Sequence, residues 1–457
     1  MGIRSFQSRT ILSVISLVSY VLTKVAVTVY AGGLVFQQVF GIKELWGIDF
    51  FWIAAIGLVV LTALYTIFGG MKSVLYTSVL QTPILLLGSL IILVLGFKEL
   101  GGWDEMMRVC GAVTVNDYGD TMTNLIRSND DANFPWLGAL IGSAIIGFWY
   151  WCTDQFIVQR VLSGKNEMEA RRGTIFGAYL KLLPVFLFLI PGMIAFALHQ
   201  KYIGAGGEGF LPMLANGTAN ADAAFPTLVA KLLPAGVKGL VVCGILAALM
   251  SSLASLFNSS AMLFTIDFYK RFRPETPEKK LVGIGQVATV VIVILGILWI
   301  PIMRSVGDVL YTYLQDVQSV LAPGIAAAFL LGICWKRTSA QGGMWGLISG
   351  MVIGLTRLGA KVYYSNAGEV ADSTFKYLFY DMNWLFFCGW MFLFCIIVVI
   401  VVSLATKAPT AEKIQGLVFG TATKEQKAAT RASWNHWDII HTVIILAITA
   451  AFYWYFW

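Results

Sequence analysis

Apolar runs recur along the whole chain and are separated by shorter polar stretches. A run of about 18 residues or more is long enough to cross the hydrocarbon core of a bilayer as a helix. Eleven such spans are predicted, at residues 10–39, 48–69, 74–97, 134–159, 171–199, 235–268, 281–303, 306–335, 341–360, 384–406 and 437–457. The pattern therefore predicts an all-α polytopic membrane protein that lies in a lipid bilayer.

The loops between the spans alternate in charge. Lys and Arg gather in the loops around 160–172, 270–280 and 407–431, whereas the long loops 98–133 and 200–234 carry no comparable basic cluster. Because short basic loops stay on the cytoplasmic side, we expect the N-terminus inside the cell and the C-terminus outside.

Composition narrows the possible functions. Of the 457 residues, 58% are hydrophobic and 12% are charged, far from the averages of soluble domains. The net charge of +7 comes from Lys and Arg in the loops, so it signals orientation and predicts no nucleic-acid partner. The six Cys lack metal-like spacing, and no paired acid and base or activated nucleophile is recognisable. We expect neither enzyme activity nor a bound cofactor.

An apolar hairpin over residues 134–199 carries more polarity than a lipid-facing hairpin would. Its first half contains GFWYWCTDQFIVQR and its second half YLKLLPVFLFLIPGM, which places Lys181 among Leu, Phe, Ile and Pro. An ionisable group at that depth is costly unless it faces a partner or a cavity, so Lys181 is a candidate site residue. The aromatic run 148–151 offers stacking faces, although an aromatic belt at the membrane interface explains such a run as well.

A second informative stretch lies in the span at 235–268. Its small residues recur at helical spacing and share one narrow face: Ala248, Ser251, Ser252, Ser255 and Ser259. Such a face serves close packing between helices, or it supplies oxygens to Na⁺, a hard cation that prefers oxygen ligands. Spacing alone leaves both interpretations open.

Several motifs together resemble one family. WYWCTDQFIVQR, YLKLLP and IPGM, with ALMSSLASLFNSSAMLFTIDFYK, YTIFGGMKSVLYT and YLQDVQSVLAPGIAAAFLLGICWKR, are similar to the sodium–glucose cotransporter branch of the sodium/solute symporter family. The resemblance covers essentially the whole chain. It implies a leucine-transporter-like core of two inverted five-helix repeats and Na⁺-coupled symport of a sugar or polyol by alternating access.

The resemblance also implies roles for individual residues. Na⁺, the coupling ion, would be bound by the Ala248 carbonyl and the hydroxyls of Ser251 and Ser252. Tyr150 would stack on the sugar ring with Trp151 beside it, and Lys181 and Gln315 would hydrogen-bond the sugar hydroxyls. Lys24 also matches a polar position of the family, and we expect it to be a structural Lys satisfied between helices.

Three departures qualify this interpretation. Ser78 stands where sugar-transporting members have Asp, and Gly147 stands where they have Thr or Asn, so ion coupling and substrate are both open. Three helices of the family fold, two of them in the first repeat, have no counterpart before residue 10, so the chain is expected to be a fragment that inserts but does not transport.

We treat 1–457 as one transmembrane domain, with 1–335 as a partial core and 336–457 as peripheral helices. The alternatives are symport of another small organic solute and a non-transporting membrane sensor or inactive fragment.

Overall fold

The computed structural model describes residues 6–214, 217–306, 309–367 and 371–456. Within these ranges the chain is helical apart from loops and one short hairpin, β1 (Glu44–Leu45) and β2 (Ile48–Asp49), which pair antiparallel. The chain divides into two compact units. Unit 1 comprises Met1–Lys24, Arg127–Ile175 and Ser259–Ile444, and unit 2 comprises Val25–Ile126, Phe176–Asn258 and Ile445–Trp457.

Most of the eleven predicted spans correspond to long apolar helices. Among the described residues, 8 helices are long and apolar enough to cross a membrane, and a bent pair, α5 and α6, makes a ninth. The principal helices are α1 (Phe6–Ser19), α2 (Ala26–Phe40), α3 (Phe50–Leu100), α5 (Trp136–Cys152), α6 (Gln155–Leu162), α7 (Glu167–Pro184), α8 (Ile190–Gly204), α10 (Ala235–Met262), α12 (Glu278–Val306), α13 (Leu310–Cys334), α14 (Ala340–Asn366), α16 (Trp384–Ala405) and α19 (His436–Tyr455). Shorter helices in the loops include α4 (Trp103–Gly111), α9 (Ala224–Leu232), α17 (Ala411–Ile414) and α18 (Lys424–Ala432).

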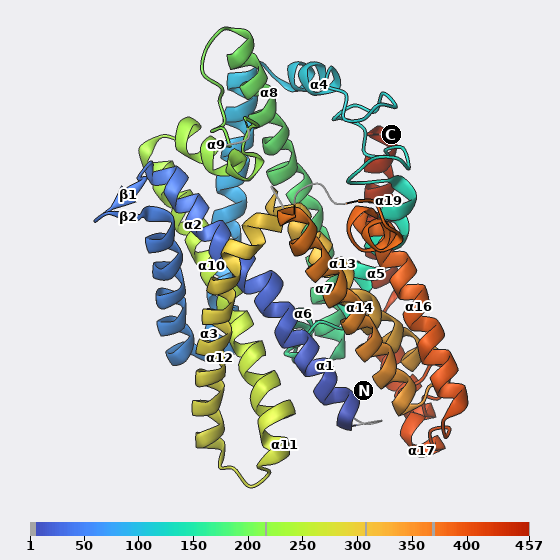
Figure 1. The fold of residues 1–457 in the computed structure, drawn as a ribbon. Helices are drawn as coiled ribbons and strands as arrows, with labels where there is room; N and C mark the ends of the chain where they lie inside the picture. The colour runs from blue at the N-terminus through green and yellow to red at the C-terminus, as the bar shows by residue number, and fades with distance from the viewer. Residues whose placement is uncertain (1–5, 215–216, 307–308, 368–370, 457) are drawn as a thin grey trace. The chain divides into compact units, whose positions relative to one another are not determined.

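Helix α3 contains two of the predicted spans. Its 51 residues are too many for one crossing, because a straight helix of that length would extend about 75 Å against a hydrocarbon core of about 30 Å. In Figure 1 the darker blue start of α3 descends from β2, and its lighter blue end rises towards α4. The predicted spans 48–69 and 74–97 therefore correspond to the two arms of α3.

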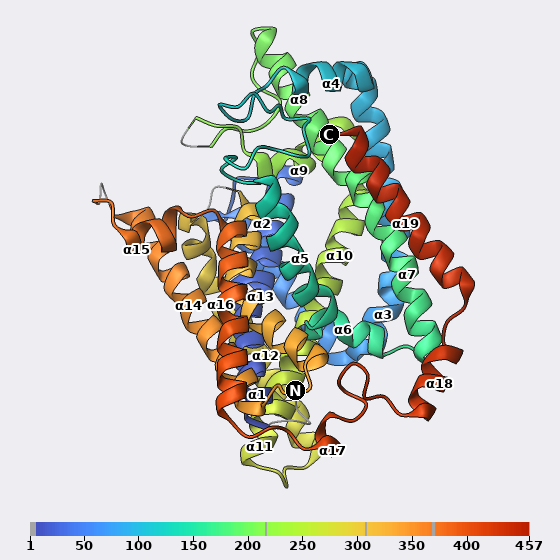
Figure 2. The same cartoon turned by 90° about the vertical axis from the view of Figure 1, so that its right-hand side faces the viewer.

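Unit 1 is built around α13. This helix packs against α5, α14 and α16, which lie side by side in Figure 2. The buried side chains between them are apolar and range in size from Ala322 and Cys388 through Ile325 and Leu385 to Trp384. Gly324 and Gly350 face each other where α13 meets α14, and a Cβ built on Gly324 would lie 3.1 Å from the Gly350 Cα. Two glycines thus allow these backbones to approach closely.

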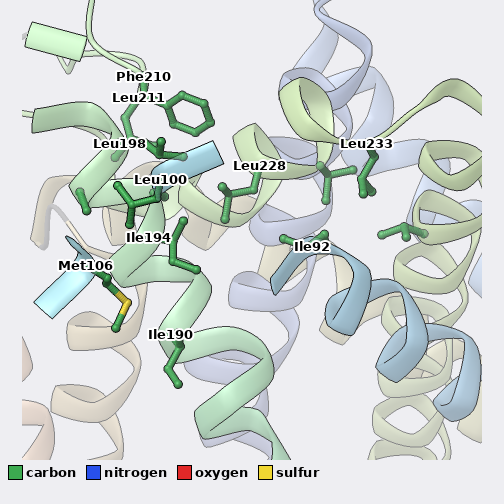
Figure 3. Packing of buried hydrophobic residues seen from close by; sticks show 14 of the residues in the cluster. Ile92, Leu100, Met106, Ile190, Ile194, Leu198, Phe210, Leu211, Leu228 and Leu233 are labelled. Atoms are coloured by element: carbon green, nitrogen blue, oxygen red, sulfur yellow. The ribbon is translucent and has the colours of Figure 1, made fainter. Parts of the chain in front are cut away.

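Unit 2 has its own apolar core, formed where α3, α8, α9 and α10 converge (Figure 3). Ile92, Ile194, Leu198 and Leu228 are fully buried within it, at 0% exposure. Phe210 and Leu211, from the loop that follows α8, pack onto this core and cover one side of it. Burial of each such side chain contributes about 1.5–3 kcal/mol, so this cluster fixes how α10 lies against α3.

Three spans contain a turn of π-helix, in which hydrogen bonds run from residue i to i+5. These turns are η1 (Tyr20–Val25), η2 (Val185–Leu189) and η4 (Leu263–Tyr269). For η2 the cause is local, because Pro191 lacks an N–H and its ring clashes with the carbonyl four residues earlier. The Ile190 N–H bonds instead to the carbonyl of Val185.

Candidate substrate and sodium sites

The aromatic run of the predicted sugar site lies at the end of α5 in unit 1. Tyr150 is half-buried, and Trp151 is 51% exposed. Their rings meet edge to face with centroids 5.2 Å apart. The helix ends because the Trp149 carbonyl accepts hydrogen bonds from the N–H groups of both Thr153 and Asp154. The two aromatic side chains therefore stand at a helix terminus, where a ring can face a ligand.

Asp154 begins the next helix. Its carboxylate accepts from the Phe156 N–H, which caps α6, and α6 leaves α5 at an angle of 48°. The same carboxylate binds the ammonium of Lys24 and, at 2.8 Å, accepts a hydrogen bond from the Tyr20 hydroxyl. The expectation that Lys24 is satisfied between helices is confirmed, and its partner is an acid at the break after Tyr150.

Gln315, the other sugar ligand predicted in unit 1, is half-buried on α13, which packs against α5. Asp316, the next residue, belongs to a cluster of charged side chains that was not predicted from the sequence. The Asp316 carboxylate binds the ammonium of Lys361, and its other oxygen lies 3.7 Å from the guanidinium of Arg357. Arg357 is fully buried, stacks 4.1 Å from the centre of the Phe387 ring and donates to the Met382 carbonyl at 2.7 Å. These charges tie α13 to α14.

Lys181 lies in unit 2 on α7, and its side chain is exposed. No residue of α7, all of which the structure describes, is buried. We expected this ammonium to face a partner or a cavity at the depth of the bilayer, and an exposed side chain agrees with a position beside a cavity. The hydrogen-bonding role of Lys181 stays a prediction.

The predicted sodium ligands lie one helical turn apart on α10, also in unit 2. Ala248 and Ser252 are half-buried, and Ser251 is 7% exposed. The Ser251 hydroxyl lies 2.6 Å from the hydroxyl of Ser78 on α3, and its carbonyl accepts from Ser255 at 3.0 Å. The residue that replaces the family's Asp thus contacts a predicted sodium ligand directly. Two hydroxyls from two helices thus lie within hydrogen-bonding distance of each other.

Gly147, the second departure from the family, lies on α5 one turn before Tyr150 and Trp151. A Cβ built at this position meets no atom of the described residues within 4 Å. A larger side chain at position 147 would therefore occupy open space beside the aromatic run.

The seven predicted site residues thus fall into two sets. Unit 1 carries Tyr150, Trp151 and Gln315, and unit 2 carries Lys181, Ala248, Ser251 and Ser252.

Within unit 2, close approaches between α3 and α10 set the position of the serine face of α10. A Cβ on Gly244 would lie 3.2 Å from Ile84, and a Cβ on Gly88 would clash with Val241.

The sequence profile described as "SSF: Sodium:solute symporter family" matches residues 3–350. The chain belongs to this family. Its members are transporters, so the expectation that the protein is not an enzyme is confirmed. The chain is accordingly a multi-pass membrane protein, as its apolar helices indicate.

The similar proteins are cotransporters. The Bos taurus sodium/mannose cotransporter SLC5A10 is 35% identical over 469 residues, which cover 98% of this chain and 77% of that protein. The Homo sapiens sodium/myo-inositol cotransporter 2 is 35% identical over 422 residues, covering 90% of this chain and 62% of that protein. The Ovis aries sodium/glucose cotransporter 1 is 37% identical over 412 residues, covering 87% of this chain and 61% of that protein. The chain therefore spans less than two thirds of the length of the inositol and glucose cotransporters.

A solved structure, the substrate-bound outward-open state of a Na⁺-coupled sialic acid symporter, has the same fold. It superposes with a TM-score of 0.67 at 21% sequence identity, over 89% of this chain and 76% of that chain. The leucine-transporter-like fold predicted from the motifs is thus confirmed.

Proposed function

We propose that the protein is a Na⁺-driven symporter of a sugar or polyol. The observation that carries this proposal is 35–37% identity, over most of the chain, to proteins named as mannose, myo-inositol and glucose cotransporters. No resident cofactor is required, because the Na⁺ gradient supplies the driving force. The partners are Na⁺, a small neutral polyhydroxylated solute and the bilayer.

The proposed sugar ligands suit an uncharged polyol. Tyr150 presents a ring face to the C–H surface of a sugar, with the Trp151 ring packed at its edge. Lys181 donates hydrogen bonds to hydroxyls, and the Gln315 amide both donates and accepts them. Such a site is selective because a solute that lacks a hydroxyl leaves the matching polar group of the protein unpaired, which weakens its binding.

The proposed sodium ligands are the Ala248 carbonyl and the hydroxyls of Ser251 and Ser252. Neutral oxygens of this kind suit a hard monovalent cation. In alternating access, bound Na⁺ stabilises one state of the transporter and thereby raises its affinity for the sugar, and the sugar raises the affinity for Na⁺ by the same factor. Residues 1–335 are proposed as the core and 336–457 as peripheral helices, with the N-terminus cytoplasmic and the C-terminus outside.

Proteoliposomes test the proposal. The purified protein is reconstituted, and uptake of radiolabelled D-glucose, D-mannose and myo-inositol is measured with an inward Na⁺ gradient and with an equal K⁺ gradient. For the full-length protein, accumulation that requires Na⁺ and collapses on adding a Na⁺ ionophore is expected. For residues 1–457 alone, we expect insertion without accumulation. Equal uptake in both gradients would refute Na⁺ coupling.

Transport of another small organic solute is the second candidate, favoured by the open space at Gly147 and by Ser78 in place of an acid. A panel of unlabelled solutes competing with the labelled sugars distinguishes the two, because a non-sugar substrate would compete more strongly than any sugar. Na⁺-dependent sugar binding without accumulation would instead indicate a sensor.

A further inference from the structure

A complete ion pair lies inside unit 1, immediately beside the proposed stacking ring. The side chains of Lys24 and Asp154 are 8% and 2% exposed. Lys24 belongs to the π-helical turn η1, and Asp154 occupies the break between α5 and α6. Buried charges are costly unless each one has partners that satisfy it, so the surroundings of this pair decide what it does.

Both oxygens of the Asp154 carboxylate have partners. One oxygen accepts from the Tyr20 hydroxyl at 2.8 Å and from the Phe156 N–H at 3.2 Å, and the other binds the Lys24 ammonium. The Phe156 N–H also lies 3.1 Å from the Tyr20 hydroxyl, so three groups close a compact network. This network fixes the first turn of α6 and with it the bend that follows Tyr150.

The Lys24 ammonium is surrounded by aromatic rings. Its Nζ lies 4.4 Å from the centre of the Phe156 ring, 4.9 Å from Tyr20, 5.2 Å from Tyr150 and 5.8 Å from Trp149. An ammonium within about 6 Å of a ring centroid attracts that ring, and the attraction is stronger where water is excluded. Tyr150 is thus held from one side by a fixed cation.

We infer that Lys24 is a positioning residue for the sugar site, acting through Asp154 and the Tyr150 ring to fix the orientation in which Tyr150 meets its substrate. This inference rests on the proposed function, because it assumes that Tyr150 stacks on the sugar. A pair that served stability alone would tolerate replacement by neutral side chains of similar volume, with no effect specific to sugar. If Lys24 positions Tyr150, replacing the pair by neutral side chains should weaken sugar binding even where the protein stays folded.

The first experiment neutralises the pair without emptying the space. In the double variant Lys24→Met/Asp154→Asn, the stem volume is kept and the Asn oxygen still accepts from Tyr20 and Phe156. The KM for sugar, measured in proteoliposomes with labelled D-glucose, D-mannose and myo-inositol in turn, should rise about tenfold, as expected for a misplaced binding group. The half-saturating Na⁺ concentration and the unfolding temperature should stay the same.

A matched control exists in the same unit. Arg127 and Asp131 form an ion pair at 3.3 Å, and the Asp131 carboxylate also accepts from the N–H groups of Asn133 and Phe134. Arg127→Met/Asp131→Asn removes an equivalent pair outside the network of Lys24, so the sugar KM should not change. An equal rise in both double variants would mean a general loss of packing and would overturn the inference.

A double-mutant cycle tests whether Lys24 acts through Tyr150. In a Tyr150→Ala background, neutralising the pair should add little, because the ring that Lys24 positions is gone. The same tenfold rise with and without Tyr150 would overturn the inference. If Tyr150→Ala alone leaves the sugar KM unchanged, the proposed sugar site itself fails, which is a separate result.

A milder variant keeps the test decisive if the double variant does not fold. Tyr20→Phe removes the hydroxyl that donates to Asp154 and accepts from the Phe156 N–H, and it removes no charge. Measured well below the temperature at which the variant unfolds, its sugar KM should rise about threefold, in line with the loss of a hydrogen bond of about average strength. An unchanged KM in folded Tyr20→Phe protein would overturn the inference.

Discussion

The contact between Ser78 and Ser251 gives a direct way to test the sodium site. Their hydroxyl oxygens are 2.6 Å apart, on α3 and α10 respectively. We consider the substitution Ser78→Asp, which restores the acid that sugar-transporting relatives are expected to have. If the Ser251 hydroxyl binds Na⁺, a carboxylate at position 78 lies about 5 Å from the ion, since one oxygen separates them.

The size of the effect follows from Coulomb's law. Two unit charges 5 Å apart attract by about 3 kcal/mol at an effective dielectric constant of about 20. Because Ser78 is half-buried, desolvation of the new carboxylate offsets about half of this. The remainder, about 1.4 kcal/mol, corresponds to a tenfold tighter affinity for Na⁺.

The assay is the Na⁺ dependence of sugar uptake into proteoliposomes, with Ser78→Asn as the control of nearly equal shape and no charge. The Asp variant should reach half-maximal uptake at about one tenth of the Na⁺ concentration needed by the original protein, and the Asn variant should not. The reasoning is refuted if Asp and Asn shift the curve equally, or if Asp leaves it unchanged.

Four further predictions follow from the described contacts. Ser252→Ala removes one proposed ligand, so uptake should require at least about tenfold more Na⁺, whereas an unchanged curve would assign this face to helix packing. Lys181→Ala should lower sugar uptake more than it lowers the amount of inserted protein, as immunoblotting of membranes and uptake measured together would show. Gly147→Asn should alter the ratio of glucose to myo-inositol uptake at an unchanged unfolding temperature, because the added side chain enters open space. Burial raises the pKa of the Cys110 thiol on α4 to about 11, so Cys110 in the folded protein should resist maleimide at pH 8. The stability that this thiol contributes should be lost between about pH 9 and pH 11, where only the unfolded thiol ionises. Cys110→Ala should make stability fall less steeply over this pH range, which thermal unfolding of both proteins at several pH values would measure.

The sequence predicted the spans well because bilayer crossing imposes one simple requirement, a long apolar helix. It also located the two polar stretches, at 147–160 and 245–270, since polarity inside a span stands out against that background. Lys181 shows the limit of this reasoning. Its apolar neighbours along the chain placed it at the depth of the bilayer. What its side chain faces depends on which helices pack against α7, and the chain pattern does not contain that information.

The charge clusters of unit 1 were missed for a related reason. Asp154 pairs with Lys24, and Asp316 pairs with Lys361, across 130 and 45 positions of sequence respectively. A signal was nevertheless present, because ionisable residues inside predicted spans are expected to have partners. Thr153 and Asp154, which follow an aromatic run, also fit the start of a new helix, since Asp is a favoured N-cap. Sequence alone could nominate these residues as paired, but only the packing of the helices identifies the pairs.

The π-helical turns have a consequence for how the spans can move. A π turn holds one residue more than an α turn, so it behaves as a dislocation in an otherwise regular helix. Such a dislocation can migrate by exchanging single hydrogen bonds, which rotates the segment it passes without unwinding the helix. In η2 the prolines at 184 and 191 flank the turn and confine it, whereas η1 lies in a stretch without proline. In η1 side-chain contacts hold the turn, among them those of Tyr20 and Lys24 with Asp154, whereas in the span of Lys181 the two prolines hold η2.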